Sequence, residues 1–186
     1  MKEKLVKVLH IKGLRKVVNL WLVNHIYAGD DKPQHFEKKR KLLISIGIDI
    51  GEGTKIVGSI YPNGQLIIGK DCWIGKNFMV NGIGKVTIGD NCDIAPEVIF
   101  QTGGHYVGDE KRRAGEGVVF NQSVGSGTWI GGRSTILNNT IIGNSCVIAG
   151  GSCVVHDVSD NMLVGGVPAK IIRKLEVKEH QNEKNI

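Results

Sequence analysis

Aliphatic or aromatic residues recur at every sixth position over most of this 186-residue chain. The recurrence shifts by two residues after Val80, breaks after Phe100 and resumes at Val118. A period of six fits neither an α-helix nor the plain alternation of a strand, so it predicts short extended segments joined by turns at fixed intervals. The series consists of Ile44, Ile50, Ile56, Ile68, Ile74, Val80, Ile88, Ile94, Phe100, Val118, Val124, Ile130, Ile136, Ile142, Ile148 and Val154, with Pro62 as its one lapse.

Glycine often follows the aliphatic residue of a six-residue unit, and a small residue often lies four positions after it. Aliphatic side chains that stack from coil to coil would form continuous apolar columns, and glycine eases the turn beside each one. The sequence therefore predicts a β-solenoid in which no coil is stable alone. We predict that the small residues four positions after the aliphatic residue face inward. They are Thr54, Cys72, Cys92, Thr128, Ser134, Thr140, Cys146 and Ser152.

Composition and charge exclude several classes of function. The four cysteines form no Cys-x-x-Cys pair and have no histidine at metal-ligand spacing, so we predict no metal requirement. The net charge is +6, but the cations gather at 1–41, 111–113 and 170–174 without interleaved aromatic residues, so we predict no nucleic-acid partner. No signal peptide and no membrane-spanning apolar run is recognisable, which predicts a cytoplasmic protein.

The two ends of the chain do not follow the repeat. Apolar residues alternate with lysines and arginines over residues 1–41, which predicts one or two amphipathic helices, broken near Gly13, that cap the open end of the solenoid. A basic helix on the inner membrane surface is the alternative, and it leaves open a peripheral membrane contact through residues 1–28. Residues 42–174 would form the solenoid, and the polar tail 175–186 would fray or form a short helical end.

The longest interruption of the repeat follows Phe100, where the sequence reads FQTGGHYVGDEKRRAGEG. We predict an excursion loop over 101–117, with His105 near its beginning between a glycine pair and a tyrosine. Imidazole titrates near neutrality and suits general base catalysis, although a single histidine in a loop is more often only polar.

Five segments carry a resemblance to a known family: IGKNFMVNG at 74–82, VTIGDNCDIAPEVIFQTGGH at 86–105, TWIGGRSTI at 128–136, VIAGGSCVVHDV at 147–158 and GGVPAKIIRK at 165–174. With the repeats, they resemble the hexapeptide-repeat acyltransferases, most closely the galactoside and maltose O-acetyltransferase branch. The resemblance implies a mainly β fold, a left-handed parallel β-helix with an N-terminal helical segment and a short C-terminal helical tail. It also implies a homotrimer with its sites between subunits.

By this resemblance, His105 would be the general base that removes the proton from an acceptor hydroxyl. Asn81 would help to bind the acceptor near the developing oxyanion, although a plain turn asparagine is the alternative. Trp129 would contact the acceptor or serve as a structural wall. The segment from Gly82 to Lys85 is shorter than in the family and has no acid, which leaves the acceptor's identity open.

The same resemblance assigns residues to acetyl-CoA, the expected co-substrate. Gly132, Gly150, Val155 and His156 would line its pantetheine arm. Lys170 and Arg173 would meet its phosphates, since two cations that point one way suit such a group, and a solvated basic segment is the alternative.

These features together predict an O-acetyltransferase that transfers acetyl directly to a hydroxyl of a sugar or glycan. A covalent acyl-enzyme is less favoured because no serine or cysteine is coupled to His105 by a visible motif. Two alternatives remain: an N-acetyltransferase of an amino sugar or of an antibiotic of the chloramphenicol type, and a noncatalytic solenoid scaffold. A carbonic anhydrase of this fold would need several zinc-binding histidines, which the repeats lack.

Overall fold

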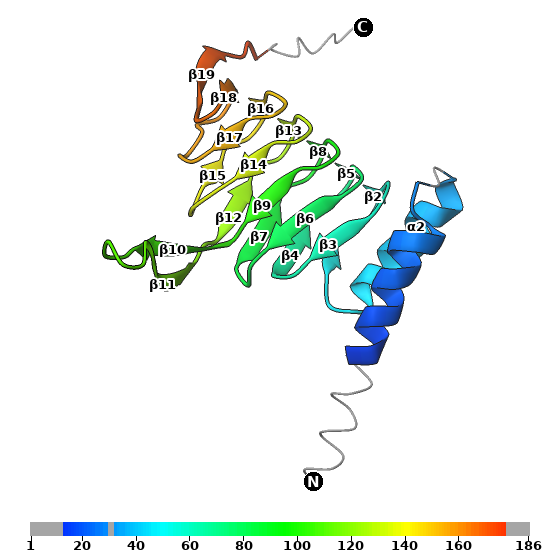
Figure 1. The fold of residues 1–186 in the computed structure, drawn as a ribbon. Coiled ribbons are helices and arrows are strands. Elements are labelled where there is room, and N and C mark those ends of the chain that lie inside the picture. The colour runs from blue at the N-terminus through cyan, green and yellow to red at the C-terminus, as the bar shows by residue number, and fades with distance from the viewer. Residues whose placement is uncertain (1–12, 30–31, 178–186) are drawn as a thin grey trace, which may run out of the picture.

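The computed structural model describes residues 13–29 and 32–177 and shows a stack of coils with helices at one end and a hairpin projecting from one side (Figure 1). Residues 13–21 are helical and continue into a π-helical turn, η1 (Leu22–Ile26). The helix α2 (Pro33–Ile44) begins with proline, whose fixed φ suits the first helical position.

The solenoid consists of three parallel sheets, to which each successive coil adds one short strand. The first sheet contains β1 (Asp49–Ile50), β4 (Gln65–Ile68), β7 (Lys85–Ile88), β12 (Gln122–Val124) and β15 (Ile141–Ile142). The second contains β2 (Lys55–Ile56), β5 (Trp73–Ile74), β8 (Asp93–Ile94), β13 (Trp129–Ile130), β16 (Val147–Ile148) and β18 (Met162–Gly166), with β19 (Ala169–Lys174) antiparallel at its edge. The third contains β3 (Ile60–Pro62), β6 (Phe78–Asn81), β9 (Ile99–Gln101), β14 (Thr135–Ile136) and β17 (Cys153–Val154).

The predicted apolar columns and the inward-facing small residues are confirmed. In the first sheet, Ile68, Ile88, Val124 and Ile142 stand directly above one another and are buried. All eight small residues predicted to face inward are buried as well, and the hydroxyls of Thr54, Thr128 and Ser134 donate to carbonyls of the next coil, as when Thr128 Oγ1 donates to Gly143 O at 2.9 Å. Close packing inside the solenoid therefore explains Cys72, Cys92 and Cys146 without a chemical role.

Three members of the series behave differently from the prediction. Ile44 was wrongly assigned to the solenoid, because it is the last residue of α2 and is 42% exposed. Val118 was also wrongly assigned, because it lies in a β-hairpin outside the coils and is only half-buried. Pro62 is no lapse: it is buried and pairs with Val80, so it continues the column of the third sheet.

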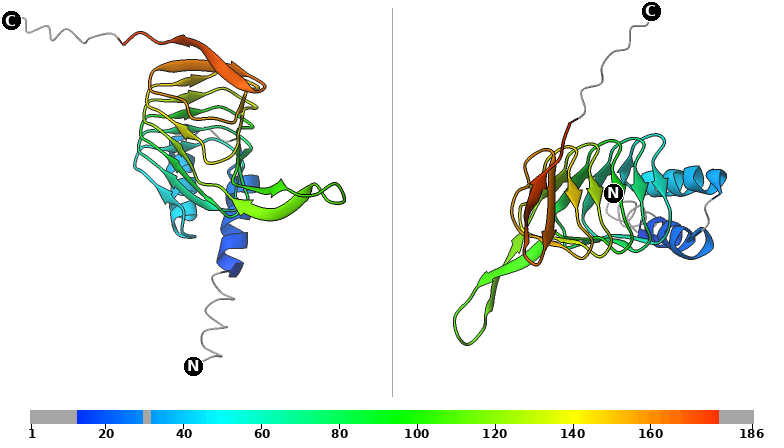
Figure 2. Two further views of the ribbon diagram at one scale, coloured as in Figure 1. Left: turned by 90° about the vertical axis from the view of Figure 1, so that its left-hand side faces the viewer. Right: turned by 90° about the horizontal axis from the view of Figure 1, so that it is seen from above.

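Both irregularities of the repeat fall at one edge of the solenoid, the third-to-first corner, where the chain leaves the third sheet and enters the first. Ile50 pairs with Ile68, Ile68 with Ile88, and Ile88 with Val124, so successive coils contain 18, 20 and 36 residues. The predicted excursion is an antiparallel hairpin of β10 (Gly103–Val107) and β11 (Ala114–Val119), which projects away from the coils (Figure 2). Both insertions beyond the 18-residue coil therefore lie at this corner.

The helices pack against the first coil. Val23, Phe36 and Leu43 are buried, and the buried Lys39 Nζ donates a hydrogen bond to Val57 O at 3.0 Å. The proposed contact with a membrane through residues 1–28 falls partly outside the described residues, and it remains a prediction. No helix among the described residues is long and apolar enough to cross a membrane. At the other end, residues 175–177 form no helix, and the remainder of the predicted helical tail lies outside the described residues.

Candidate active site

The root of the hairpin is fixed to the preceding coil by Thr102, which is fully buried. Its backbone N–H and its hydroxyl both donate to Asn81 O, at 2.7 and 2.9 Å. Its own carbonyl accepts a hydrogen bond from Phe120 N at 2.9 Å, where the chain returns from the hairpin. The outgoing and returning strands are thus held at one residue, which sets the direction in which the hairpin leaves the corner.

His105 lies on β10, opposite Gly117, and is exposed. Its Nδ1 is 2.8 Å from Gly115 O. A carbonyl oxygen can only accept a hydrogen bond, so Nδ1 is the donor, and in the neutral ring the lone pair is on Nε2. The hairpin thus holds the imidazole in an orientation that suits proton transfer at Nε2.

Two glycines at the root of the hairpin, Gly104 and Gly82, have a packing reason. A Cβ on Gly104 would lie 3.0 Å from Cε2 of the Phe120 ring, which is tighter than ordinary contact. A Cβ on Gly82 would lie 2.7 Å from Gly103 N, because the two corner segments touch there. Glycine therefore lets the root of the hairpin lie close to the preceding coil.

Asn81 ends β6 and pairs with Gln101 of β9, so it lies at the same corner as the hairpin root. Its carbonyl is occupied by Thr102, whereas its half-buried side-chain amide forms no hydrogen bond with the residues that the structure describes. The structure brings Asn81 and His105 to one corner of the solenoid and leaves an amide donor free there.

Trp129 lies elsewhere, on the outer face of the second sheet, where 54% of it is exposed. It stands between Asp93 and Val147 in a row of directly paired residues that crosses this face. No hydrogen bond or ring contact links it to the hairpin among the described residues. A single chain therefore does not unite Trp129 with His105.

Lys170 and Arg173 lie on β19 and share one face despite being three residues apart. Lys170 pairs with Gly165 and Arg173 with Leu163, and an irregularity in the register absorbs the odd residue between them. Gly165 and Leu163 are two residues apart on β18, so both positions lie on the side of the strand opposite to the buried Val164 side chain. Their partners Lys170 and Arg173 lie on that same side. The irregularity thus turns both cations toward the outer face of the second sheet.

The remaining predicted residues lie at two corners. Gly132 and Gly150 follow β13 and β16, where a Cβ on Gly150 would lie 3.3 Å from Gly132 O and one on Gly132 would lie 3.1 Å from Pro96 O. Close stacking of the coils already accounts for both glycines. Val155 and His156 follow β17 at the third-to-first corner, and His156 is exposed.

The predicted site residues thus form two groups on different sides of the solenoid. The corner group is at the third-to-first corner and contains His105, Asn81, Val155 and His156. The face group is on the second sheet and its following corner and contains Trp129, Gly132, Gly150, Lys170 and Arg173.

Sequence reasoning did not identify the residues that support the hairpin. Besides Thr102, it missed Gln122, which is buried where the chain returns and whose Nε2 lies within hydrogen-bonding distance of Gln101 O and Ile136 O, at 3.1 and 3.0 Å. A signal was present for Gln122, since a long polar residue stands two positions before Val124, where the preceding coil has the buried Val86. It also missed Trp73 and Asp93, which lie beside Trp129.

Comparison with known proteins identifies the class of enzyme that this fold and these two groups define. No family model matches the chain. The galactoside O-acetyltransferase of Escherichia coli strain K12 is 32% identical over 174 residues, which cover 90% of this chain and 81% of that enzyme. This chain therefore belongs to the hexapeptide-repeat acyltransferases, in the galactoside and maltose O-acetyltransferase branch, and is an acetyl-CoA-dependent acyltransferase.

Solved structures agree with this membership. A galactoside acetyltransferase in complex with coenzyme A is 28% identical, with a TM-score of 0.63 and coverage of 90% of this chain and 82% of that one. A hexapeptide-repeat acetyltransferase of Vibrio cholerae, complexed with acetyl-coenzyme A, is 23% identical with a TM-score of 0.72 and coverage of 92% and 90%, and it supports the fold alone. The fold is thus the predicted left-handed parallel β-helix.

Proposed function

We propose that this enzyme transfers the acetyl group of acetyl-CoA to a hydroxyl of a sugar or glycan, with His105 as the general base. The observation that carries the proposal is the hydrogen bond between His105 Nδ1 and Gly115 O, which leaves the lone pair on Nε2 at an exposed position. A sugar hydroxyl is a poor nucleophile at neutral pH, so its attack on a thioester needs such a base.

The reaction then proceeds in two steps. His105 Nε2 takes the hydroxyl proton while the oxygen attacks the thioester carbonyl, and the unoccupied amide of Asn81 donates a hydrogen bond to the oxyanion that forms. The tetrahedral intermediate collapses by breaking the carbon–sulfur bond, and the CoA thiolate recovers the proton from His105. No covalent acyl-enzyme is required.

The division of the site residues supports a site shared between subunits. The corner group holds the base, and the face group holds the exposed indole and the cation pair that suits the phosphates of CoA. Because these groups lie on different sides of one solenoid, we infer that the corner group of one subunit meets the face group of the next in a homotrimer. Cyclic assembly with heterologous contacts permits such a pairing three times.

The test is thiol release from acetyl-CoA over a panel of mono- and oligosaccharides, amino sugars and chloramphenicol. We expect turnover with a hydroxyl acceptor, and His105→Ala should lower kcat by about 10²–10⁴-fold, the usual contribution of a general base. Tyr106→Ala is the matched control, since Tyr106 is the next residue on β10 and is also exposed. Turnover with amine acceptors alone would replace O-acetylation by N-acetylation, and an undiminished rate in His105→Ala would remove His105 from the mechanism.

A further inference from the structure

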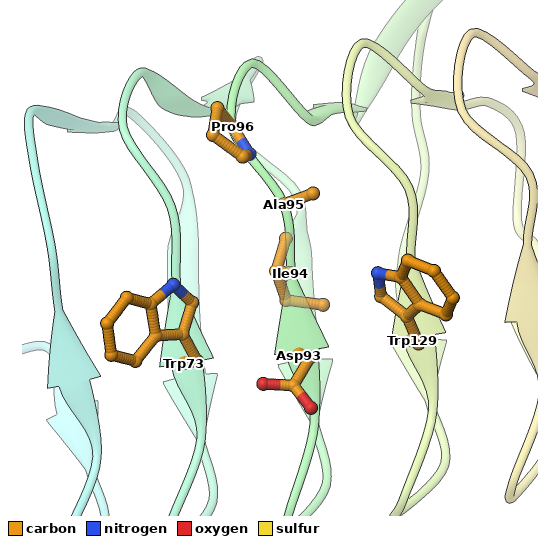
Figure 3. Close-up of a pocket in the computed structure, with 6 residues that line it drawn as sticks. All are labelled: Trp73, Asp93, Ile94, Ala95, Pro96 and Trp129. Atoms are coloured by element: carbon orange, nitrogen blue, oxygen red, sulfur yellow. The ribbon is translucent and has the colours of Figure 1, made fainter.

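A row of paired residues crosses the outer face of the second sheet and includes Trp73, which no sequence motif had singled out. Trp73 pairs with Asp93, and Asp93 pairs with Trp129. These three residues, with Ala95 and Pro96, line a pocket of about 330 Å³, the tryptophan pocket, in which an indole stands on either side of the strand that carries Asp93 (Figure 3).

Trp73 is held in place by its surroundings. The ring of Phe36 on α2 lies 6.0 Å from it between centroids, and Lys55 Nζ lies 5.8 Å from its ring centre. Even so, 39% of Trp73 remains exposed. An indole that is held by such contacts and is still partly exposed is a pre-organised apolar surface for a ligand.

Asp93 determines what kind of ligand the tryptophan pocket can take. Its side chain is exposed and forms no hydrogen bond or ion pair with any residue in the part of the chain that the structure describes. Covering this face with an apolar protein surface would bury an unpaired carboxylate, which costs several kcal/mol. The ligand must therefore offer hydrogen-bond donors to Asp93 as well as apolar groups to the indoles.

We propose that the tryptophan pocket binds one sugar ring of the acceptor, with apolar C–H groups of the ring against the exposed indoles of Trp73 and Trp129 and a hydroxyl donating to Asp93. The pocket volume of about 330 Å³ accommodates one such ring beside Asp93. This assignment rests on the proposed function, because it places the ring next to Trp129.

The same row gives the acceptor an orientation. Beyond Trp129 it continues through Val147 and Leu163 to Arg173, at the end of the face that carries the cation pair. Acetyl-CoA held by those cations would extend toward Trp129 from one end, and the tryptophan pocket lies at the other. The ring in the pocket would then be a neighbour of the sugar that is acetylated, so the substrate class is an oligosaccharide or a longer glycan rather than a monosaccharide.

The experiment measures binding and turnover separately. Isothermal titration with malto-, cello- and galacto-oligosaccharides, in the absence of acetyl-CoA, should show binding that strengthens from the monosaccharide to the trisaccharide. Trp73→Ala and Asp93→Asn should each weaken this binding by about tenfold, the loss expected from one stacking surface or one charge-assisted hydrogen bond. They should also raise KM for the oligosaccharide while leaving KM for acetyl-CoA unchanged. Tyr61→Ala, an exposed aromatic residue on the third sheet, and Asp49→Asn, an exposed acid on the first, are the controls.

The outcomes separate this inference from the proposed function. If Trp73→Ala and Asp93→Asn bound oligosaccharides as tightly as the wild type, the tryptophan pocket would not be a sugar site, even if His105→Ala had abolished turnover. A change of oligomeric state in Trp73→Ala, measured by light scattering, would also overturn it, because the Trp73 indole would then be buried against a neighbouring subunit instead of lining a sugar site. Conversely, loss of oligosaccharide binding in both pocket variants would support the pocket, even if His105→Ala retained full activity.

Discussion

At the scale of single residues, burial changes completely between neighbours on one short strand. Ile142 and Ile141 are consecutive on β15, yet Ile142 is buried in the column of the first sheet and Ile141 is 57% exposed. The stacked column has the packing of a protein interior, so removing one member leaves a cavity that the rigid coils above and below cannot close.

We therefore expect Ile142→Ala to lower the free energy of unfolding by about 2–5 kcal/mol, the usual cost of a large-to-small change in a core. Ile141→Ala removes the same atoms from an exposed site and should change the free energy by less than about 0.5 kcal/mol. Urea unfolding followed by circular dichroism measures both. Similar losses in the two variants would mean that the exposed row is covered in the assembled protein.

The cysteines give a second prediction at this scale. Cys72, Cys92 and Cys146 are buried. The hydrogen bond between Cys72 and Cys92 lowers the pKa of the Cys72 thiol to about 7 and, together with burial, raises the pKa of the Cys92 thiol above its ordinary value. A thiol must be accessible as well as ionised to react with an electrophile, so burial protects even Cys72. We expect these three to stay unmodified by a maleimide in the native protein at neutral pH and to react in denaturant. Cys153 is only half-buried, and Cys153→Ser should abolish any native labelling; labelling that persists in that variant would contradict the packing described above.

At the scale of elements, the hairpin shows what a periodic sequence can and cannot predict. The interruption itself was evident, and His105 was placed near its start. The pairing of β10 with β11 was not evident, because residues 108–113 are mostly polar or charged and carry no alternation. For the same reason Val118, which keeps the six-residue spacing by coincidence, was assigned to a coil. Ile44 fitted the spacing equally well. It lies in a helix, however, where its neighbour Leu43 packs inward and Ile44 is left exposed.

We expect Thr102→Val to disturb the hairpin more than the coils. The substitution keeps the shape of the side chain but removes the hydroxyl that donates to Asn81 O and accepts from Gly84 N, at 2.9 and 3.2 Å. Leaving such buried groups unpaired costs about 1–3 kcal/mol. Hydrogen exchange should accelerate across residues 103–119, with a fall in turnover. Thr135→Val, on the outer face of β14, is the control and should change neither; unchanged exchange in Thr102→Val would show that the root is held by other contacts.

At the scale of the whole molecule, the sequence identified site residues without showing that they divide into two groups. Motifs are read along the chain, whereas neighbours on a face are set by the lengths of the coils between them. Trp73, Asp93 and Trp129 become adjacent only because the intervening coils contain 20 and 36 residues. The family resemblance supplied the nine predicted site residues, and only the three-dimensional structure could show that they lie on different sides of one solenoid.

The proposed site between subunits makes a prediction about mixed assemblies. His105→Ala should inactivate the corner group and the double variant Lys170→Ala with Arg173→Ala should weaken the face group, so each alone should be inactive at low acetyl-CoA concentration. In trimers formed by coexpressing the two in equal amounts, about one site in four should combine an intact corner with an intact face, because the two groups come from different chains. Light scattering should give three times the 20.2 kDa of one chain.

Coexpression of His105→Ala with Asn81→Ala is the control, since both changes fall in the corner group and no site would be restored. Activity that stays absent in the first mixture, while trimers form, would show that each chain builds its own site.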